Sequence, residues 1–162
     1  MKIVVTGSSG QLGAALCRHF GPRAIGLDHA ALDIADRDAA QAVIDQLRPD
    51  VVVNTAAYTA VERAENDRQA CQAVNADAVG YLAEACGRRD ALLVQVSTDY
   101  VFGRDASRSA PYDETDEPAP QSVYGQSKLA GEQRAAACPR HLIVRTCGLY
   151  GRRGPGSGST NF

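Results

Sequence analysis

The chain has 162 residues, of which 44% are hydrophobic and 22% charged, and its formal net charge is −2. This length favours one globular domain with its own core, and the near-neutral charge gives no basic field of the kind that binds nucleic acid. No apolar run is long enough to span a membrane, and the opening residues MKIVVTG are too few for a signal peptide.

The N-terminal stretch predicts a turn that binds a dinucleotide. The β-branched residues 3–5 predict a buried strand, and glycines at intervals of three then precede a segment with helical periodicity. In such a unit the glycines permit a tight turn, a close approach of the backbone to pyrophosphate, and close packing of the helix on the strand. A plain turn between strand and helix is the alternative. The predicted cofactor-binding residues of this turn are Gly7, Ser9, Gly10, Gln11, Leu12 and Gly13.

A candidate ribose-binding acid follows the second predicted strand. We expect a helix over residues 10–20, and then a strand over residues 24–27. Asp28 lies about twenty residues beyond the first glycine, where an acid usually accepts hydrogen bonds from the adenosine ribose. Because a carboxylate repels a 2′-phosphate, Asp28 favours NADH over NADPH as the cofactor. The alternative is a solvated acid at a strand end.

Residues 32–34 have two interpretations. They could run beside the adenine, with Asp33 accepting a hydrogen bond from the exocyclic amine and Ile34 contacting the cofactor. They could equally form a loop to the next helix, which ends near Leu47, with Asp36 as its N-cap.

Three valines at residues 51–53 predict a strand that is apolar on both faces, as a central parallel strand should be. Small residues at the end of such a strand leave room for a flat ligand against the backbone. We therefore expect Ala56, Ala57 and Tyr58 to contact the cofactor.

A polar connection over residues 59–67 leads to the longest predicted helix, residues 68–88. Asn75 falls on or near the buried face of that helix. Because a buried amide needs hydrogen-bond partners, we expect Asn75 to bond the backbone of residues 56–58. A strand over residues 92–96 follows.

Residues 103–121 are rich in serine, proline and acids and predict a long loop, which inside a compact domain is often functional. A helix then begins at Ser122 and runs to about Ala137, and residues 141–145 predict a fifth strand. The expected organisation is a nucleotide-binding domain over residues 1–150, followed by a glycine-rich tail over residues 151–162.

Strands that alternate with helices, without hairpin signals, predict an α/β fold with a doubly wound parallel sheet of the Rossmann type. Right-handed crossovers suggest the spatial order 3-2-1-4-5. The ligand crevice should then lie outside the carboxyl ends of strands one and four.

The five cysteines are odd in number and widely spaced, and no CxxC pair occurs. The pattern suggests neither a metal site nor a disulfide framework. We interpret these residues as small buried thiols of a cytoplasmic protein.

Tyr124 and Lys128 are four residues apart on a predicted helix, so both should project from one face. An ammonium beside a phenol stabilises the phenolate, which predicts a lowered pKa for Tyr124 and a usable general acid for a carbonyl that receives hydride. A pair on a solvated helix face is the alternative.

Five motifs together carry a family resemblance: GSSGQLG, VNTAAYTAVERAE, VSTDYVFG, YGQSKLAGE and VRTCGLYG. They resemble the extended short-chain dehydrogenase/reductases, and within them the dTDP-4-dehydrorhamnose reductases, over about residues 1–151. The resemblance implies NAD(P)H-dependent reduction of the 4-keto group of a nucleotide-linked deoxysugar, and it suggests a homodimer.

The resemblance also implies roles for individual residues. Thr98, Tyr124 and Lys128 would be catalytic: Tyr124 would protonate the sugar C4 oxygen, Thr98 would hydrogen-bond it, and Lys128 would hold the nicotinamide ribose. Substrate contacts would come from Thr59, Val61, Thr98, Asp99 and Tyr100.

Two other functions compete with reduction. An epimerase or dehydratase is disfavoured, because related dehydratases carry an Asp-Glu pair after the threonine and this chain has Tyr100 in place of the glutamate. A non-catalytic nucleotide-binding scaffold subunit would not require Thr98, Tyr124 and Lys128 together. Members of the reductase family are much longer, so we expect this chain to lack the C-terminal substrate lobe and to turn over sugar nucleotide poorly or not at all.

Overall fold

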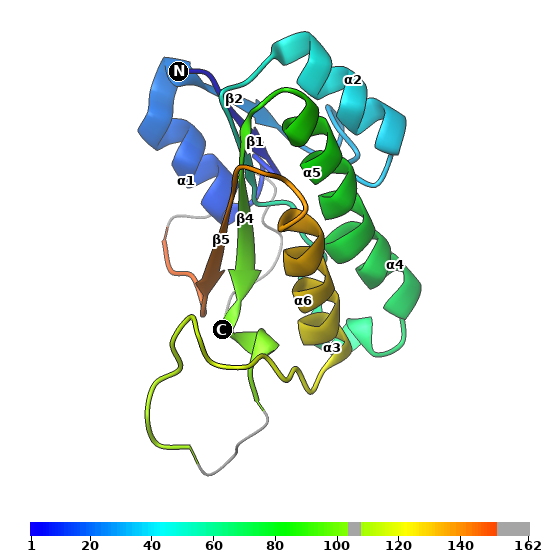
Figure 1. Cartoon of the computed structure of the whole chain (residues 1–162), viewed down its shortest axis with the longest axis vertical. Coiled ribbons are helices and arrows are strands. Elements are labelled where there is room, and N and C mark those ends of the chain that lie inside the picture. Colours follow the sequence, from blue (N-terminus) through cyan, green and yellow to red (C-terminus); the bar gives the residue numbers. More distant parts are fainter. Residues whose placement is uncertain (104–107, 152–162) are drawn as a thin grey trace.

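The computed structural model describes residues 1–103 and 108–151, and its frame is a parallel sheet (Figure 1). Residues 104–107 of the predicted loop and residues 152–162 of the predicted tail lie outside the described residues. The strands are β1 (Ile3–Thr6), β2 (Ala24–Leu27), β3 (Val51–Asn54), β4 (Leu92–Thr98) and β5 (His141–Thr146). Their order in the sheet is β2-β1-β3-β4-β5, and every neighbouring pair is parallel.

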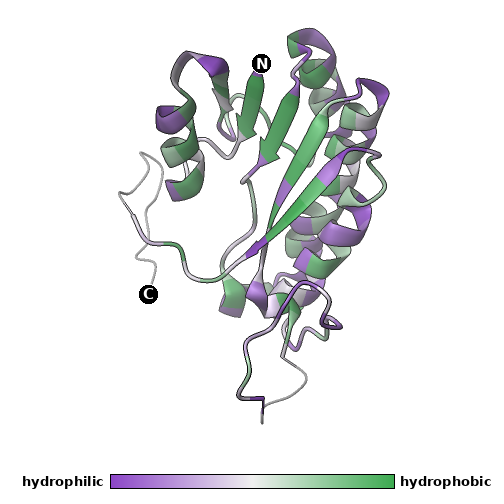
Figure 2. Ribbon diagram, turned by 60° about the vertical axis from the view of Figure 1, so that its left-hand side comes forward, coloured by the Kyte–Doolittle hydropathy of each residue, from purple (hydrophilic) through white to green (hydrophobic). Residues whose placement is uncertain are grey.

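The helices cover the two faces of the sheet unequally (Figure 2). On one face α1 (Gln11–Phe20) packs against β1 and β2. The other face is covered by α2 (Arg37–Leu47), α5 (Ala78–Arg88) and α6 (Val123–Ala135). The shorter helical segments are η1 (Gly21–Arg23), α3 (Val61–Ala64), α4 (Arg68–Gln72), η2 (Ala73–Asp77) and η3 (Asp99–Val101).

The predicted fold class is confirmed, and the position of one strand differs from the predicted order. The winding reverses beside β1, since β2 lies on one side of it and all later strands lie on the other. Taken along the chain, the third strand lies between β1 and β4, not outside β2. The valine run explains this place, because Val52 and Val53 are buried in clusters on opposite faces, as in a central strand. The crevice at the reversal therefore lies outside the carboxyl ends of β1 and β3.

The predicted helix over residues 68–88 is one helical run with a π turn in its middle. α4 leads into η2, and η2 leads into α5, with right-handed helical backbone at each junction. A π turn changes the direction of the side chains that follow it and often marks a functional site. Here it contains Asn75, which is buried. Hydrophobic periodicity alone does not distinguish this turn from an α turn.

Buried polar side chains join the carboxyl ends of β1 and β3 to the middle of β4. The Thr6 hydroxyl donates to Asn54 Oδ1 at 2.5 Å, and Asn54 Nδ2 donates to Gln95 Oε1 at 2.8 Å. Because buried polar groups without partners are costly, this chain of bonds fixes the relative register of β1, β3 and β4 at the edge where the predicted site lies.

Within the described part of the chain, no helix combines the length and the apolar character that a bilayer crossing requires.

Candidate active site

The turn after β1 packs directly against the loop after β3. Gly7 has a φ of +67°, in the left-handed region that favours glycine. A Cβ on Gly7 would lie 2.7 Å from the Ala56 nitrogen, and a Cβ on Gly13 would lie 2.3 Å from the Gly7 carbonyl oxygen. Only glycine permits both contacts, so the tight turn and the close helix packing predicted for these two residues are present.

The start of α1 has the features of an anion site. Its N-cap is Gly10, no side chain caps the helix, and its first turn carries no acid. The turn that leads into it contains Ser9, and its first residues are Gln11 and Leu12. The amides of a helix start, together with the helix dipole, attract phosphate. These residues therefore fit the pyrophosphate of a dinucleotide.

Asp28 lies directly after β2, next to the glycine turn. The Ser8 amide donates to the Leu27 carbonyl at 3.1 Å, which holds the turn beside the end of β2. Asp28 Oδ1 accepts from the Ala31 amide at 2.9 Å, which closes the turn after the strand. The carboxylate is thus at the predicted edge of the sheet, and its contact with a ribose stays a prediction.

Residues 32–34 form a loop that leads to α2, as the second interpretation predicts. Leu32 and Ile34 are buried in the core cluster beneath α2, so the side chain of Ile34 points into the protein. Asp33 is exposed and accepts from the Ala35 amide at 2.9 Å, and Asp36 caps α2 through the Ala39 amide. A contact of Asp33 and Ile34 with the cofactor stays a prediction, and for Ile34 it would involve the backbone.

The predicted bond between Asn75 and the loop after β3 is confirmed. Asn75 Oδ1 accepts from the Tyr58 amide at 2.9 Å, and Asn75 Nδ2 donates to the Tyr58 carbonyl at 3.0 Å. The Tyr58 ring packs toward Cys71 and Val123, and its hydroxyl donates to Asp67 at 3.2 Å. The π turn therefore holds the backbone of Tyr58, the last residue of the predicted cofactor-contacting loop 56–58.

The three predicted catalytic residues come together from two elements. Thr98 is the last residue of β4, and Tyr124 and Lys128 lie on α6. The Thr98 side chain lies near the Tyr124 phenol and acts to lower its pKa. The Lys128 ammonium is buried, with 4% of the residue exposed, and donates to the Val96 carbonyl at 2.7 Å. The cap that Ser122 provides to the Gly125 amide starts α6 where Tyr124 falls in its first turn.

The pKa of Tyr124 moves in the direction opposite to the prediction. Burial raises the pKa of Tyr124 above its usual value near 10, and the neighbouring Thr98 side chain only partly offsets this effect. The ammonium of Lys128 is directed at the backbone of β4. Burial also lowers the pKa of Lys128 to about 8. The sequence motif gives the spacing of the pair but not its burial, which is why the predicted direction was wrong.

Two of the predicted substrate residues line a hollow of about 490 Å³ at the end of β4. Asp99 and Tyr100 begin η3, and the Tyr100 ring meets the Tyr124 ring edge to face at 5.6 Å. Thr59 is exposed and Val61 begins α3. The sequence did not single out the other residues that line this hollow, which are Glu65, Phe102, Gly103, Gln121 and Ser122. Gly103 and Gln121 belong to the 103–121 loop, whose length had predicted a functional role.

Side-chain stacking fastens the described part of that loop to β5. The Phe102 and Tyr112 rings stack at 4.4 Å. The Arg145 guanidinium lies over the Phe102 ring, 5.0 Å from its centroid, and the Arg108 guanidinium lies over the Tyr112 ring at 4.4 Å. Arg108 also pairs with Asp116, with a shortest distance of 2.7 Å. Cation–π contacts of this kind contribute ~0.5–2 kcal/mol each, so the loop has a defined position beside the candidate site.

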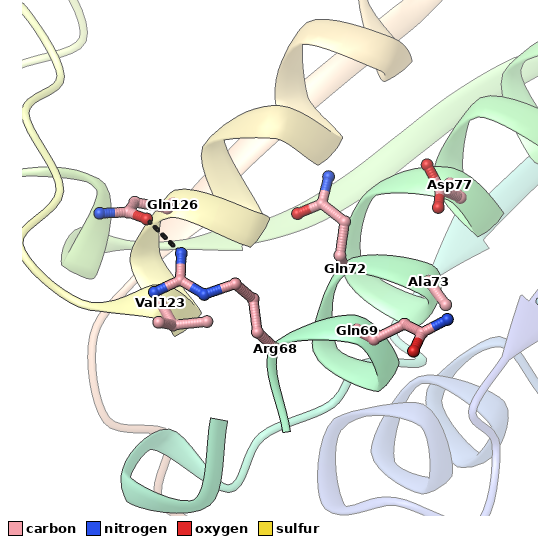
Figure 3. Close-up of a pocket in the computed structure, with 7 residues that line it drawn as sticks. All are labelled: Arg68, Gln69, Gln72, Ala73, Asp77, Val123 and Gln126. Carbon is pink, nitrogen blue, oxygen red and sulfur yellow. Dashed lines mark hydrogen bonds between the residues drawn. The ribbon is translucent and has the colours of Figure 1, made fainter. Parts of the chain in front are cut away.

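A second hollow, of about 540 Å³, opens between α4 and α6, and Figure 3 shows the residues that line it. Arg68 reaches across it to Gln126, with 3.4 Å between Nη1 and Oε1. It contains none of the site residues predicted from the sequence. Its lining is formed by Arg68, Gln69, Gln72, Ala73, Asp77, Val123 and Gln126.

Comparison with known proteins identifies relatives along nearly the whole chain. The family model described as RmlD substrate binding domain matches residues 1–161. The dTDP-4-dehydrorhamnose reductase of Mycobacterium tuberculosis (strain CDC 1551 / Oshkosh) is 45% identical over 155 residues, which are 92% of this chain and 50% of that protein. The chain spans about half the length of the curated relatives it matches.

Solved structures agree with this relationship. The dTDP-4-dehydrorhamnose reductase from Bacillus anthracis str. Ames in complex with NADP has a TM-score of 0.89 and 39% identity, covering 95% of this chain and 56% of that one. The dTDP-4-dehydrorhamnose reductase from Clostridium acetobutylicum ATCC 824 has a TM-score of 0.90 and 38% identity, covering 100% and 56%. The chain therefore belongs to the RmlD substrate binding domain family and is a homologue of the dTDP-4-dehydrorhamnose reductases.

Proposed function

We propose that this chain is the cofactor-binding part of a reductase that transfers hydride from NADH or NADPH to the 4-keto group of a dTDP-linked deoxysugar. The observation that carries the proposal is the placement of Thr98, at the end of β4, beside Tyr124 in the first turn of α6, with Lys128 one helical turn further along. A protein that only binds nucleotide would not need a phenol and a hydroxyl side by side at the end of β4.

The residues at the sheet reversal fit a nicotinamide dinucleotide. The start of α1 would bind the pyrophosphate, Asp28 the adenosine ribose, and the backbone of residues 56–58 the middle of the cofactor. Lys128 would hold the nicotinamide ribose. A bound reduced nicotinamide supplies the hydride.

Tyr124 would donate the proton that the substrate oxygen needs. Its pKa is raised by burial, so the phenol is protonated at neutral pH, as a general acid must be before it acts. Thr98 would orient the same oxygen, and Tyr100, whose ring meets that of Tyr124, would line the substrate side. Asp99 is the only acid among residues 97–100, which suits carbonyl reduction better than elimination of water.

The sugar nucleotide, the oligomeric state and the cellular compartment are parts of the same proposal. The dTDP sugar is proposed from the names of the relatives, and a homodimer from the family resemblance. None of the five cysteines, all of which are described, forms a disulfide. Free thiols fit a reducing compartment, so we place the protein in the cytoplasm.

The test uses a fusion protein, because the relatives have a second half that this chain does not cover. Residues 1–151 are joined to the second half of the Mycobacterium tuberculosis reductase, and the oxidation of NADH and of NADPH with dTDP-4-keto-6-deoxy-L-mannose is followed. We expect turnover that Tyr124→Phe reduces by about 10²-fold or more and that Tyr81→Phe, on α5, leaves unchanged. Equal turnover by the Tyr124→Phe fusion would contradict the assigned role. The 162-residue chain alone should turn over poorly.

A scaffold subunit is the second candidate, and one observation favours it. Leu142 and Val144 on β5 are 52% and 36% exposed. Exposed apolar side chains on a strand favour association. Sedimentation of the chain with and without Leu142→Lys tests this: a stable assembly that the substitution dissolves would support the scaffold role, and a monomer would oppose it.

A further inference from the structure

A buried carboxylate on α6 has no part in the reaction proposed above. Glu132 is 4% exposed and accepts three hydrogen bonds. The Ser97 hydroxyl donates to Oε1 at 2.6 Å, and Arg145 donates through Nε to Oε1 at 2.9 Å and through Nη2 to Oε2 at 2.7 Å. A buried ion pair often stabilises a fold no better than apolar residues of the same volume. Its presence here therefore needs another reason.

The position of Glu132 relative to the candidate catalytic lysine gives that reason. Glu132 lies four residues after Lys128, so the two side chains share one face of α6. Lys128 bonds the carbonyl of Val96 at 2.7 Å, and Glu132 bonds the side chain of the next residue, Ser97. Two adjacent residues of β4 are thus held by two adjacent turns of α6. The residue that follows them in β4 is Thr98.

The titratable groups around Lys128 also connect it to Glu132. The titratable groups that act on it are Glu132, from its own helix, and Cys71, from α4. Arg145, from β5, reaches Glu132 from the other side. An ammonium that is buried to this degree loses most of its hydration, and a nearby carboxylate favours its charged form. Glu132, on the same face of α6, is thus a carboxylate that favours the ammonium form of Lys128.

We propose that Glu132 is a positioning residue: held by Ser97 and Arg145, it fixes α6 against β4, so that Lys128 and Tyr124 meet Thr98, and it keeps Lys128 as an ammonium. The catalytic consequence rests on the proposed function. The positioning and the charge do not, because they concern contacts within this chain.

The chain offers a direct measurement, because Lys2 and Lys128 are its only lysines. Protein labelled with ¹³C at lysine Cε gives two lysine NMR signals, and Lys2→Arg assigns them. We expect Glu132→Gln, which keeps the shape of the side chain and removes the charge, to lower the titration midpoint of Lys128 by about one pH unit or more. Glu84→Gln, which removes an exposed ion-pairing carboxylate on α5, should leave it unchanged.

A role limited to stapling α6 to the sheet predicts a different result. In that case the Lys128 midpoint is the same in the folded wild-type protein and in folded Glu132→Gln, and the proposal fails. A second measurement needs no variant at position 132. In wild-type protein labelled at glutamate Cδ, the Glu132 signal should move with the Lys128 midpoint, and a flat Glu132 signal through that range would overturn the proposal.

This outcome is independent of the proposed activity. If the protein binds neither NADH nor NADPH, the proposed function fails, while the Lys128 titration still reports whether Glu132 sets the charge of the lysine. If the cofactor binds and the midpoint does not respond to Glu132→Gln, the proposed effect of Glu132 on Lys128 fails alone, and the proposed function stands.

Discussion

Asn75 holds both backbone groups of Tyr58, accepting from its amide at 2.9 Å and donating to its carbonyl at 3.0 Å. The pair joins a π turn in the longest helical run to the loop at the reversal of the sheet. Asn75 Nδ2 also donates to Ser127 on α6 at 3.0 Å. One amide therefore ties the predicted cofactor loop to the helix that carries Tyr124 and Lys128.

Replacing Asn75 should destabilise the protein and loosen that loop. Asn75→Ala leaves the amide and the carbonyl of Tyr58 without their partner, and an unsatisfied buried group costs ~1–3 kcal/mol. Urea unfolding measures the loss. Asn66→Ala, at an exposed position, should change the free energy of unfolding by less than ~0.5 kcal/mol. Equal effects of the two substitutions would contradict the structural role of Asn75.

Two helical glycines should respond in opposite ways to alanine. A Cβ on Gly13 would lie 2.3 Å from the Gly7 carbonyl, whereas a Cβ on Gly87 would meet only Pro139 Cδ, at an ordinary 3.4 Å. Gly13→Ala should therefore destabilise by ~1–3 kcal/mol through overpacking. Gly87→Ala should stabilise by up to ~1 kcal/mol through helix propensity. Thermal unfolding compares them, and stabilisation by Gly13→Ala would show that the turn is not packed as described.

The buried Lys128 should make stability depend on alkaline pH. Its pKa is lowered from 10.5 to about 8 by burial, so between these values the unfolded chain holds a proton that the folded chain has lost. Stability therefore rises with pH across this window. The free energy of unfolding of the wild type relative to Lys128→Met should rise by ~3 kcal/mol from below pH 8 to above pH 10.5. Urea unfolding at a series of pH values measures this difference, and a flat difference would mean that the lysine is not desolvated.

Asp28 should set the preference between the two nicotinamide cofactors. Its carboxylate would repel a 2′-phosphate by ~1 kcal/mol or more, which is about fivefold or more in affinity. Asp28→Ser should therefore tighten NADPH binding relative to NADH binding by that factor. Asp38→Ser, in the first turn of α2, is the matched control. An unchanged ratio of the two dissociation constants in Asp28→Ser would remove Asp28 from the ribose site.

Local patterns made part of this structure predictable. The glycine turn, the N-caps Asp36 and Ser122, and the spacing of Tyr124 and Lys128 depend on residues close together in the chain. The partner of Asn75 was also predictable, because a buried amide must find hydrogen bonds near the loop it faces.

Other features depend on which elements meet in space. Glu132 was not singled out by the sequence, because Ser97 and Arg145 come from two different strands. The pKa direction of Tyr124 follows from burial under several elements, which a motif on one helix does not contain. The place of β3 depends on how the sheet is wound, and the order of the elements along the chain allowed a different one.

The most direct test of the central claim is calorimetric titration of the chain with NADH and, in parallel, with NADPH. If the glycine turn, Asp28 and the loop held by Asn75 form a cofactor site, at least one of the two should bind with one-to-one stoichiometry, and Gly13→Ala should abolish the binding. No heat of binding with either cofactor, from a sample shown to be folded, would contradict the claim that these residues form a nicotinamide dinucleotide site.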